Sequence, residues 1–312
     1  MRNRAERLEW APDGRGARCD WLWTSDLHIA RVFPSTARRL LDIATADWPI
    51  VLGDEPPAIS ETPDVSFLIG HRGMQRLPHL LTTLRGIAAQ KEVSVECIVV
   101  EQSNEREIAG ALPEWVRYIH TPLPRRDLPY CRAWSLNVAA RAARGRVLVL
   151  QDNDLLLPQH YAAELVRHRD QGARFIDLKR LSFYVAEAAT RLVFERGSIE
   201  DIREFDGVVQ NLQGASIAAD REAYFDIGGF DESFVGWGGE DNDFWDRART
   251  MKVYDFGYLP AIHLWHAPQP EKASRHAPAL ARYQELRALP VQDRIRTLRR
   301  RAWGSQNSLA AE

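Results

Sequence analysis

Cysteine is scarce in this sequence of 312 residues, and long apolar runs are absent. Cys19, Cys97 and Cys131 are the only cysteines, and no two of them have a C-x-x-C spacing. This excludes a small disulfide scaffold and favours a reducing compartment with free thiols. No stretch approaches the roughly 18 apolar residues of a membrane span, and residues 1–7 lead into no apolar signal segment. We expect a cytoplasmic protein without a transmembrane segment, with a peripheral position at the inner face of the membrane left open.

An excess of either charge is also lacking. The formal net charge is -2, and lysine occurs at only four positions, 91, 179, 252 and 272. Binding to a phosphate backbone usually needs a clearly basic surface, so this balance argues against a nucleic-acid partner. The apolar share of 45% is enough for a buried core in one large α/β domain or two modest ones.

Short apolar runs alternate with helical periodicities along most of the chain. Helices are expected over 75–90, where apolar residues recur at helical spacing, and over 131–143. Buried strands are expected at VSFLIG (65–70), VECIVVE (95–101), RVLVLQ (146–151) and the shorter run FIDL (175–178). This alternation predicts a Rossmann-like α/β fold with a mostly parallel central sheet flanked by helices, and ligands at the carboxyl ends of the strands.

Composition divides the chain into three segments. Residues 1–60 carry four tryptophans, an expected helix over Thr36–Thr45 and a proline-rich end, which is typical of an accessory segment followed by a linker. The α/β pattern covers 61–275. From 276 to 312 the chain is arginine-rich with a helical pattern, and we expect a docked helical extension there rather than a membrane-surface helix.

An acidic triplet follows the third buried strand. Asp152, Asn153 and Asp154 come directly after VLVLQ, so two carboxylates stand where open α/β sheets place their ligands. Oxygen ligands of this kind suit Mg²⁺ or Mn²⁺, and a divalent ion there would neutralise a departing diphosphate. A simple polar turn is the alternative, because Asp and Asn are common turn residues.

A glycine-rich stretch carries a second group of acids. Residues 228–247 read GGFDESFVGWGGEDNDFWDR, with acidic side chains at Glu240, Asp241, Asp243 and Asp246. Acids at the start of a helix suit its dipole, so helix capping is one interpretation. Capping leaves Trp237 unexplained, since a large flat side chain between two glycines is typical of a sugar or nucleotide platform. We therefore interpret this loop as functional.

Two histidines stand near the end of the α/β segment. His263 and His266 are three residues apart in AIHLWHAPQP, a spacing that can bring both to one side of a helical turn or bend. One or both can ligate a metal, and either can instead be a structural core residue. Histidine combined with carboxylates suits Mn²⁺ better than an all-oxygen site does, although imidazole also accepts zinc or iron.

GWGGEDND (236–243) resembles the GWGGEDDD-type signature of the β-1,4-galactosyltransferases and the related N-acetylgalactosaminyl and chondroitin-type transferases. Those enzymes have a GT-A fold, a metal motif of DxD type and a downstream metal histidine, and this sequence offers all three in that order. The resemblance covers about residues 64–270. It implies a metal-dependent, inverting glycosyltransferase that uses Mn²⁺ (or Mg²⁺) to move a hexose or N-acetylhexosamine from a UDP-sugar to a glycan or glycoconjugate hydroxyl.

The same resemblance assigns roles to residues. It implies metal ligands at Asp152 and Asp154, with His266 as the metal histidine and His263 at a neighbouring position that varies in the family. FLIGHRGMQRLPHL, YCRAWSLNVA and QGASIAADREAYFDIGGFDE resemble family segments around the donor, so the implied donor-binding residues are Gly70, His71, Arg72, Glu101, Tyr130, Arg132, Asp152, Asn153 and Gly214. The implied acceptor site comprises Trp237, Gly238, Gly239, Glu240 and Asp241, with Asp241 as general base and Glu240 orienting sugar hydroxyls.

Two other classes of protein fit the same residues. A metal-dependent hydrolase of nucleotide sugars would use the aspartates and histidines to activate water, and a non-catalytic sugar-binding protein could have kept the fold. The candidate donor sugars differ by one hydroxyl orientation or one acetamido group, so the sequence leaves the sugar, the acceptor and the oligomeric state open. The expected setting is a bacterial cytoplasmic enzyme that builds a surface polysaccharide, lipid-linked glycan or glycoconjugate.

Overall fold

The computed structural model describes residues 8–10, 17–19, 24–236, 238–255, 257–268 and 270–305. Trp237, which the sequence assigns to the acceptor site, lies outside these ranges. A two-stranded ribbon of β1 (Leu8–Trp10) and β2 (Ala17–Cys19) precedes the two larger sheets. Among the described residues, no helix combines the length and the apolar character that crossing a membrane requires.

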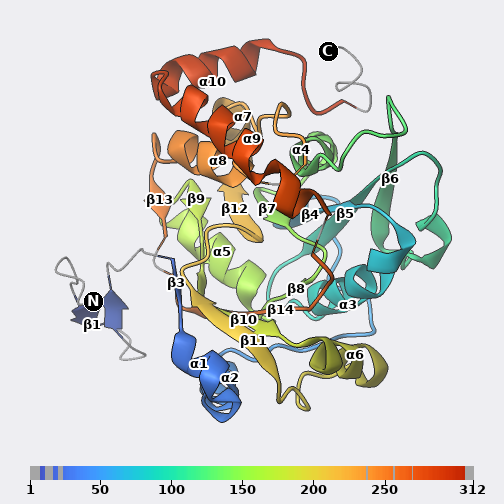
Figure 1. Cartoon of the computed structure of the whole chain (residues 1–312), viewed down its shortest axis with the longest axis vertical. Coiled ribbons are helices and arrows are strands. Elements are labelled where there is room, and N and C mark those ends of the chain that lie inside the picture. Colours follow the sequence, from blue (N-terminus) through green and yellow to red (C-terminus); the bar gives the residue numbers. More distant parts are fainter. Residues whose placement is uncertain are drawn as a thin grey trace.

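The largest sheet has seven strands. In spatial order they are β13 (Val253–Tyr254), β9 (Phe175–Ile176), β12 (Ser216–Asp220), β7 (Val147–Gln151), β4 (Val65–His71), β5 (Val95–Ser103) and β6 (Val116–Pro122). The run from β7 to β6 is parallel, whereas β12 is antiparallel to both of its neighbours. The carboxyl ends of β7, β4 and β5 therefore meet at one edge (Figure 1). This confirms the predicted α/β fold with a mostly parallel central sheet.

Helices cover both faces of this sheet. Alternate residues of each buried strand point to opposite sides, so apolar side chains on both faces need a covering layer. Phe67 and Val149 pack on one side with α3 (Leu77–Ala88) and α5 (Tyr161–Asp170). Leu68 and Leu150 pack on the other side. The helices there are α4 (Arg132–Ala142), α7 (Arg221–Asp226), α8 (Glu240–Ala248) and α10 (Val291–Arg300). A core on both faces explains why these strands are predominantly apolar in the sequence.

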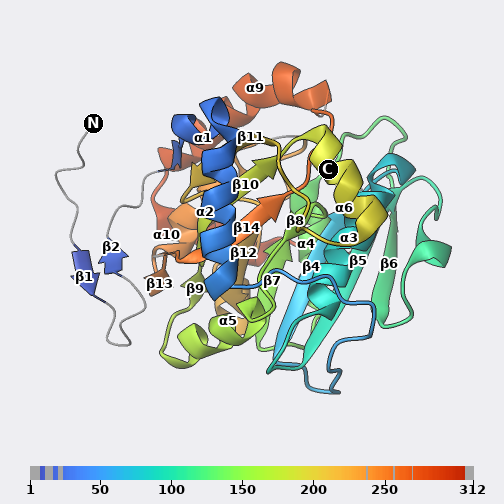
Figure 2. The same cartoon turned by 90° about the horizontal axis from the view of Figure 1, so that it is seen from below.

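A second sheet of five strands adjoins the first. Its order is β3 (Ser25–Asp26), β11 (Phe205–Gln210), β10 (Lys179–Val185), β14 (Leu259–His263) and β8 (Leu155–Leu156). The helices α1 (His28–Val32), α2 (Pro34–Asp47) and α6 (Glu187–Arg196) pack against it, and α2 runs across β10 and β14 (Figure 2). Leu41 of α2 lies in one buried cluster with Phe183 and Ile262. From residue 24 on, the expected accessory segment therefore shares a core with the rest of the chain.

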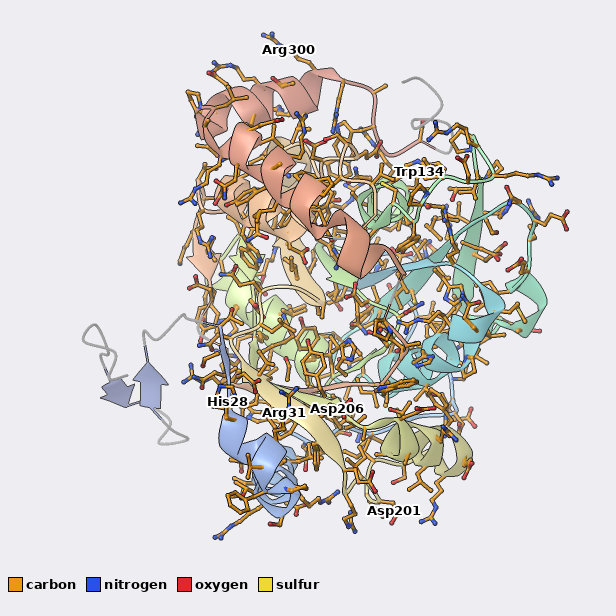
Figure 3. The ribbon with its side chains drawn as sticks, viewed as in Figure 1. His28, Arg31, Trp134, Asp201, Asp206 and Arg300 are labelled. Carbon is orange, nitrogen blue, oxygen red and sulfur yellow. The ribbon has the colours of Figure 1, made fainter. Side chains whose placement is uncertain are left out.

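A hydrogen bond adds to the packing of α1 against the second sheet. Arg31 on α1 donates from Nε to the main-chain carbonyl of Asp206, at 2.8 Å, and both residues lie in the lower part of the view in Figure 3. The 3₁₀ turns η1 (Met74–Arg76) and η2 (Ala109–Ala111) and the helix α9 (Pro270–Arg287) complete the elements. The arginine-rich C-terminal part of the chain forms α9 and α10, and Pro278 lies inside α9.

Candidate active site

The acidic triplet lies where the two large sheets meet. It follows β7 directly and precedes β8. The Asp152 amide donates to the Ala215 carbonyl at 2.8 Å, and the Leu264 amide donates to the Asp154 carbonyl at 2.9 Å. These two hydrogen bonds join the triplet to the loop before β12 and to the end of β14. Residues far apart in the sequence are thereby brought to one edge of the large sheet.

Asp154 forms a group with both candidate metal histidines. One ligand atom from each of Asp154, His263 and His266 lies within 4.8 Å of the others. His263 Nε2 is 3.7 Å from Asp154 Oδ1, and His266 Nε2 is 3.4 Å from Asp154 Oδ2. His263 ends β14 and His266 follows in coil, so a strand end and a loop, not a helical turn, bring them together.

The chemistry of this group fits a divalent cation. His266 Nδ1 donates to the Ala267 carbonyl at 2.7 Å, and burial lowers the pKa of His266, so its Nε2 carries a lone pair that faces the Asp154 carboxylate. Two lone-pair atoms at that distance repel unless a cation lies between them, and a backbone acceptor on the other ring nitrogen is usual for metal-binding histidines. Asp154 Oδ1 is buried without a hydrogen-bond partner among the described residues.

Charge also keeps Asp154 ionised. Burial alone would raise the pKa of Asp154, but the facing His263 and the charge and hydrogen bond of Arg76 outweigh it and lower the pKa. The side chain is only 4% exposed. A buried carboxylate of this kind needs compensating positive charge in every state of the protein.

Asp152, the other predicted metal ligand, does not join this group. Its carboxylate accepts from Arg132 Nε at 2.6 Å, and Arg132 Nη1 donates to Asp241 at 3.1 Å. Arg132 Nη2 is buried and has no hydrogen-bond partner in the described ranges. Arg132 therefore connects the acidic triplet to α8.

Asn153 and His71 form a buried chain of hydrogen bonds beside Asp154. Arg76 Nη2 donates to Asn153 Oδ1 at 3.0 Å, Asn153 Nδ2 donates to His71 Nδ1 at 2.9 Å, and His71 Nε2 donates to the Gly73 carbonyl at 3.1 Å. This direction is fixed because burial lowers the pKa of His71 to about 4, which leaves the ring neutral. Arg76 also pairs with Asp154 Oδ2. Arg76 was not among the residues predicted from the sequence, although its position in FLIGHRGMQRLPHL, four residues after Arg72, was a usable signal.

The remaining predicted donor residues lie at the ends of β4 and β5. The Tyr130 hydroxyl stands only 2.1 Å from where a Cβ on Gly70 would be, so Gly70 allows this close approach. Arg72 donates to the Gln102 and Leu128 carbonyls, each at 2.8 Å. The structure thus brings Gly70 and Tyr130 together and fixes Arg72 to the protein.

Glu101 is at the same edge of the sheet but is engaged within the protein. It is fully buried. Its carboxylate accepts from the Glu107 amide at 3.1 Å and from the Tyr118 hydroxyl. Carboxylate oxygens occupied in this way hold the 103–108 loop against β6.

The two predicted catalytic acids begin α8. Burial raises the pKa of Glu240 to about 7, and the neighbouring charge of Asp241 adds to this rise. Burial also raises the pKa of Asp241, with Arg132 opposing it. The Asp241 side chain is still 26% exposed, so it can reach a bound molecule. Carboxyl groups with raised pKa values are suited to general base catalysis.

The glycine loop before α8 has backbone that favours glycine. Gly236, Gly238 and Gly239 all have positive φ values, 93°, 97° and 87°. A Cβ on Gly239 would come within 2.7 Å of the Phe234 ring and 3.0 Å of the Ala279 carbonyl on α9. The loop therefore has a backbone conformation that residues with a side chain would disfavour, and α9 packs against it at Gly239.

The other two acids of the loop serve the fold. Asp243 is buried against Arg247, at 2.8 Å, and against Arg294 of α10, at 2.7 Å. Asp246 accepts from the Tyr283 hydroxyl of α9 at 3.0 Å. Of the four acids, Glu240 and Asp241 face the site, while Asp243 and Asp246 attach α8 to the C-terminal helices.

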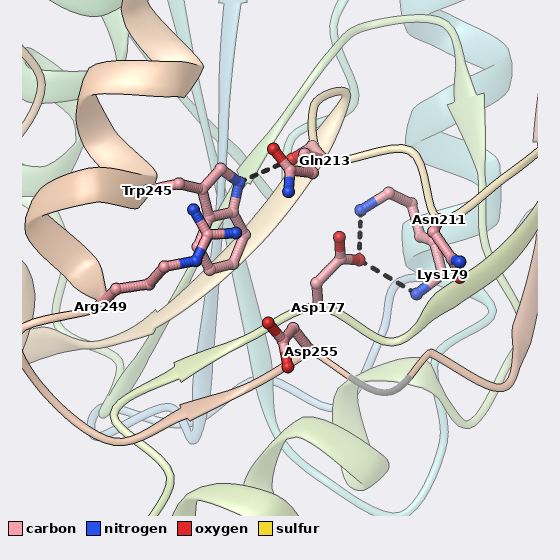
Figure 4. A pocket seen from close by; sticks show the side chains of 7 residues that line it. All are labelled: Asp177, Lys179, Asn211, Gln213, Trp245, Arg249 and Asp255. Carbon is pink, nitrogen blue, oxygen red and sulfur yellow. Dashed lines mark hydrogen bonds and ion pairs between the residues drawn. The ribbon is translucent and has the colours of Figure 1, made fainter. Parts of the chain in front are cut away.

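A cavity of about 20 Å³ lies behind the loop that carries Gly214, among Asp177, Lys179, Asn211, Gln213, Trp245, Arg249 and Asp255 (Figure 4). Lys179 Nζ donates to Asp177 at 2.6 Å and to the Ser216 carbonyl, and Trp245 Nε1 donates to the Gln213 carbonyl at 2.9 Å. This volume suits one water molecule. The contacts to the Gln213 and Ser216 carbonyls fix the backbone on either side of Gly214.

Gly214 on that loop sets the position of Asp241. A Cβ at Gly214 would lie 2.6 Å from Asp241 Oδ2. We expect Gly214→Ala to push the carboxylate aside and lower kcat about 10-fold, since displacements of about 1 Å near reacting atoms can cost up to about 100-fold. The change in melting temperature should be small, because a side-chain end moves rather than backbone. Gly110→Ala, where nothing lies within 4 Å, is the control; equal kcat in both variants would contradict this placement.

Sequence comparison finds a family match within this site. Residues 202–262 match the model of a family described as the N-terminal domain of galactosyltransferase. The matched segment includes Gly214, Glu240 and Asp241. A search of curated proteins found no significant match.

Solved glycosyltransferase structures are distantly similar. A mannosyltransferase from Pyrobaculum calidifontis, in complex with GDP-Man and Mn²⁺, is 16% identical over 91% of this chain and 79% of its own, with a TM-score of 0.48. Glucosyl-3-phosphoglycerate synthase from Mycobacterium tuberculosis, in complex with Mn²⁺, UDP-glucose and phosphoglyceric acid, is 15% identical over 78% and 89%, with a TM-score of 0.49. The catalytic domain of Drosophila β-1,4-galactosyltransferase 7, in complex with xylobiose, is 16% identical over 61% and 63%, with a TM-score of 0.35.

These structural likenesses are too distant to assign residues, whereas the family match falls on the glycine-rich loop and the two acids that begin α8. By that match residues 202–262, with the glycine-rich loop and the start of α8, are similar to a domain of the galactosyltransferases.

Proposed function

We propose that this chain transfers a hexose or N-acetylhexosamine from a UDP-sugar to a hydroxyl of a glycan or glycoconjugate, with inversion at the anomeric carbon. The observation that carries the proposal is the Arg132 bridge, which joins Asp152 of the acidic triplet to Asp241 on α8. The bridge, together with the group formed by Asp154, His263 and His266, supports a general base and a metal in the same site. Donor and acceptor groups are thereby expected in one site.

Each residue of the site has a task in this proposal. Asp154, His263 and His266 would hold Mn²⁺ (or Mg²⁺), and the bound ion would supply Lewis-acid neutralisation of the diphosphate. Arg132 offers its open Nη2 group to the donor and fixes the Asp241 carboxylate. Asp241 takes the proton of the acceptor hydroxyl, and Glu240 beside it accepts hydrogen bonds from sugar hydroxyls. Gly238 and Gly239 let the acceptor approach the loop backbone.

Product analysis tests the proposal against its rivals. The purified protein would be incubated with Mn²⁺ and a panel of UDP-sugars, with and without mono- and disaccharide acceptors. The proposal predicts a new glycoside whose formation depends on the acceptor, with the anomeric configuration opposite to that of the donor. UDP release that no acceptor changes would favour the hydrolase, and binding without any release would favour a sugar-binding protein.

The pH dependence tests the assignment of the base. A general base works only when unprotonated, so kcat/KM should fall as the pH drops through the raised pKa values of the pair, near 7 for Glu240. Glu240→Gln removes the group whose pKa is raised to about 7, which should move this limb to lower pH. A profile that is flat between about pH 5 and pH 8, or a limb that stays in place in the variant, would contradict the assignment.

The setting of the enzyme is a part of the proposal. Cys97 and Cys131 are buried and free, which is consistent with the cytoplasmic location expected from cysteine usage. We propose that the product is a bacterial surface polysaccharide, a lipid-linked glycan or a glycoconjugate. Export of the native protein to an oxidising compartment would contradict the location.

A further inference from the structure

Arg76 occupies a position that a metal site would not be expected to tolerate. It lies in the η1 turn, and its side chain is 17% exposed. Its Nη2 group pairs with Asp154 Oδ2, and the same carboxylate oxygen faces His266 Nε2 at 3.4 Å. One oxygen of the candidate metal group is thus already in contact with a fixed positive charge. A guanidinium group cannot lose its proton to make way for another cation.

Two buried atoms show that this pairing leaves interactions unmade. Arg76 Nη1 and Asp154 Oδ1 are both buried without a hydrogen-bond partner in the described part of the chain. An arginine with only a structural role would be expected to use its donors, since an unpaired buried donor destabilises the fold. The open Nη1 group is suited to an anionic oxygen that arrives with a ligand, because a guanidinium binds phosphate through two parallel N–H groups.

The η1 turn that carries Arg76 makes few packing contacts with the rest of the protein. Gly73 before it has a φ of 82°, and the turn has no side-chain cap. Met74 in the same turn is 50% exposed, and no residue of the turn is buried. Arg76 can therefore move by rotation of its own side chain, without disturbing the core beneath α3.

We propose that Arg76 is an internal cation that competes with the divalent metal for Asp154 and is released when the donor diphosphate binds. This deepens the proposed function, on which it rests. Without donor, Arg76 neutralises Asp154 and weakens metal binding. With donor, the diphosphate oxygens take the guanidinium, and the carboxylate becomes free for the metal. Metal and nucleotide then bind with positive coupling, which must be the same in either order of addition.

Mn²⁺ titration of the metal-free protein tests this, by calorimetry or by the electron paramagnetic resonance signal of free Mn²⁺, with and without UDP. In Arg76→Gln we expect Mn²⁺ alone to bind on the order of 10-fold tighter, and the tightening by UDP to shrink on the order of 10-fold. Arg76→Lys keeps the charge without the planar fork and should give an intermediate affinity. Arg85→Gln is the control, because Arg85 belongs to α3 and pairs with exposed Asp54 at 2.8 Å, away from Asp154.

The melting temperature in EDTA gives a second readout that does not depend on activity. Arg76→Gln leaves a buried carboxylate unpaired, so it should lower the melting temperature in EDTA and widen the gap between EDTA and Mn²⁺. Unchanged or weaker Mn²⁺ binding in Arg76→Gln would overturn the inference while the proposed function stands. Equal Mn²⁺ binding by Asp154→Asn and wild type would contradict both the proposed metal site and the inference. Tighter Mn²⁺ binding by Arg76→Gln, with no sugar transfer by the wild type, would support the inference and contradict the proposed function.

Discussion

Asp241→Asn is expected to reduce the rate of transfer by about 10²–10⁴-fold, the typical contribution of a general base. The amide cannot accept the proton of the acceptor hydroxyl, although it keeps the size of the carboxylate. It can still accept a hydrogen bond from Arg132, which lies 3.1 Å from Asp241 Oδ1. Initial rates of glycoside formation at saturating donor, together with the melting temperature, measure the effect.

The same substitution at a distant aspartate is the control that separates an effect on folding from an effect on catalysis. Asp226→Asn makes the same substitution on α7, where the side chain is exposed and 4.0 Å from Arg299. It should leave both the rate and the melting temperature unchanged. A loss of less than about 10-fold in Asp241→Asn would show that another group takes the proton, and Glu240 would be the first to test.

Arg247→Met is expected to lower the free energy of unfolding by about 3–5 kcal/mol, the usual cost of removing one partner of a buried ion pair. Arg247 is fully buried, with its guanidinium 2.8 Å from Asp243. It also donates to the Ile227 and Gly229 carbonyls, at 2.7 and 2.6 Å. Methionine would fill part of the space but leave both carbonyls without this donor. Equilibrium unfolding in urea gives the change from the shift of the midpoint.

The control for this variant is an exposed arginine on another helix. Arg191 pairs with Glu187 one turn away on α6, and its side chain is 67% exposed. Arg191→Met should cost no more than about 0.5 kcal/mol, as is usual for a surface pair on a helix. A loss below about 1 kcal/mol in Arg247→Met would mean that Arg294, 2.7 Å from Asp243, is sufficient to neutralise that carboxylate.

The parts of the fold that could be predicted are those with uniform burial. β4, β5 and β7 are buried at every residue, so each carries a predominantly apolar run that stands out in the sequence. The second sheet was not predicted because its strands are mixed: β10 begins with Lys179 and Arg180, and its burial alternates irregularly. The expected strand at 175–178 covers only Phe175–Ile176, because Asp177 turns to pair with Lys179.

The candidate site was predictable where a residue type and its position carry the chemistry. Asp154, His263 and His266 lie together, since Asp154 follows β7, His263 ends β14 and His266 stands three residues later. The pairings of arginine were not predictable. Arg76 reaches Asp154 across 78 positions and Arg132 reaches Asp241 across 109. Such contacts depend on the packing of α3 and α4 against the sheet, which no local pattern encodes.

The central claim is that Asp154 helps to bind a divalent cation together with a nucleotide-sugar. The most direct test is the melting temperature of the protein with Mn²⁺, crossed against UDP-, GDP- and dTDP-sugars, in wild type and Asp154→Ala. We predict that a UDP-sugar stabilises the wild type only when Mn²⁺ is present, and that Asp154→Ala abolishes this gain. Absence of any shift with every nucleotide-sugar and metal, or an equal shift in Asp154→Ala, would contradict the account.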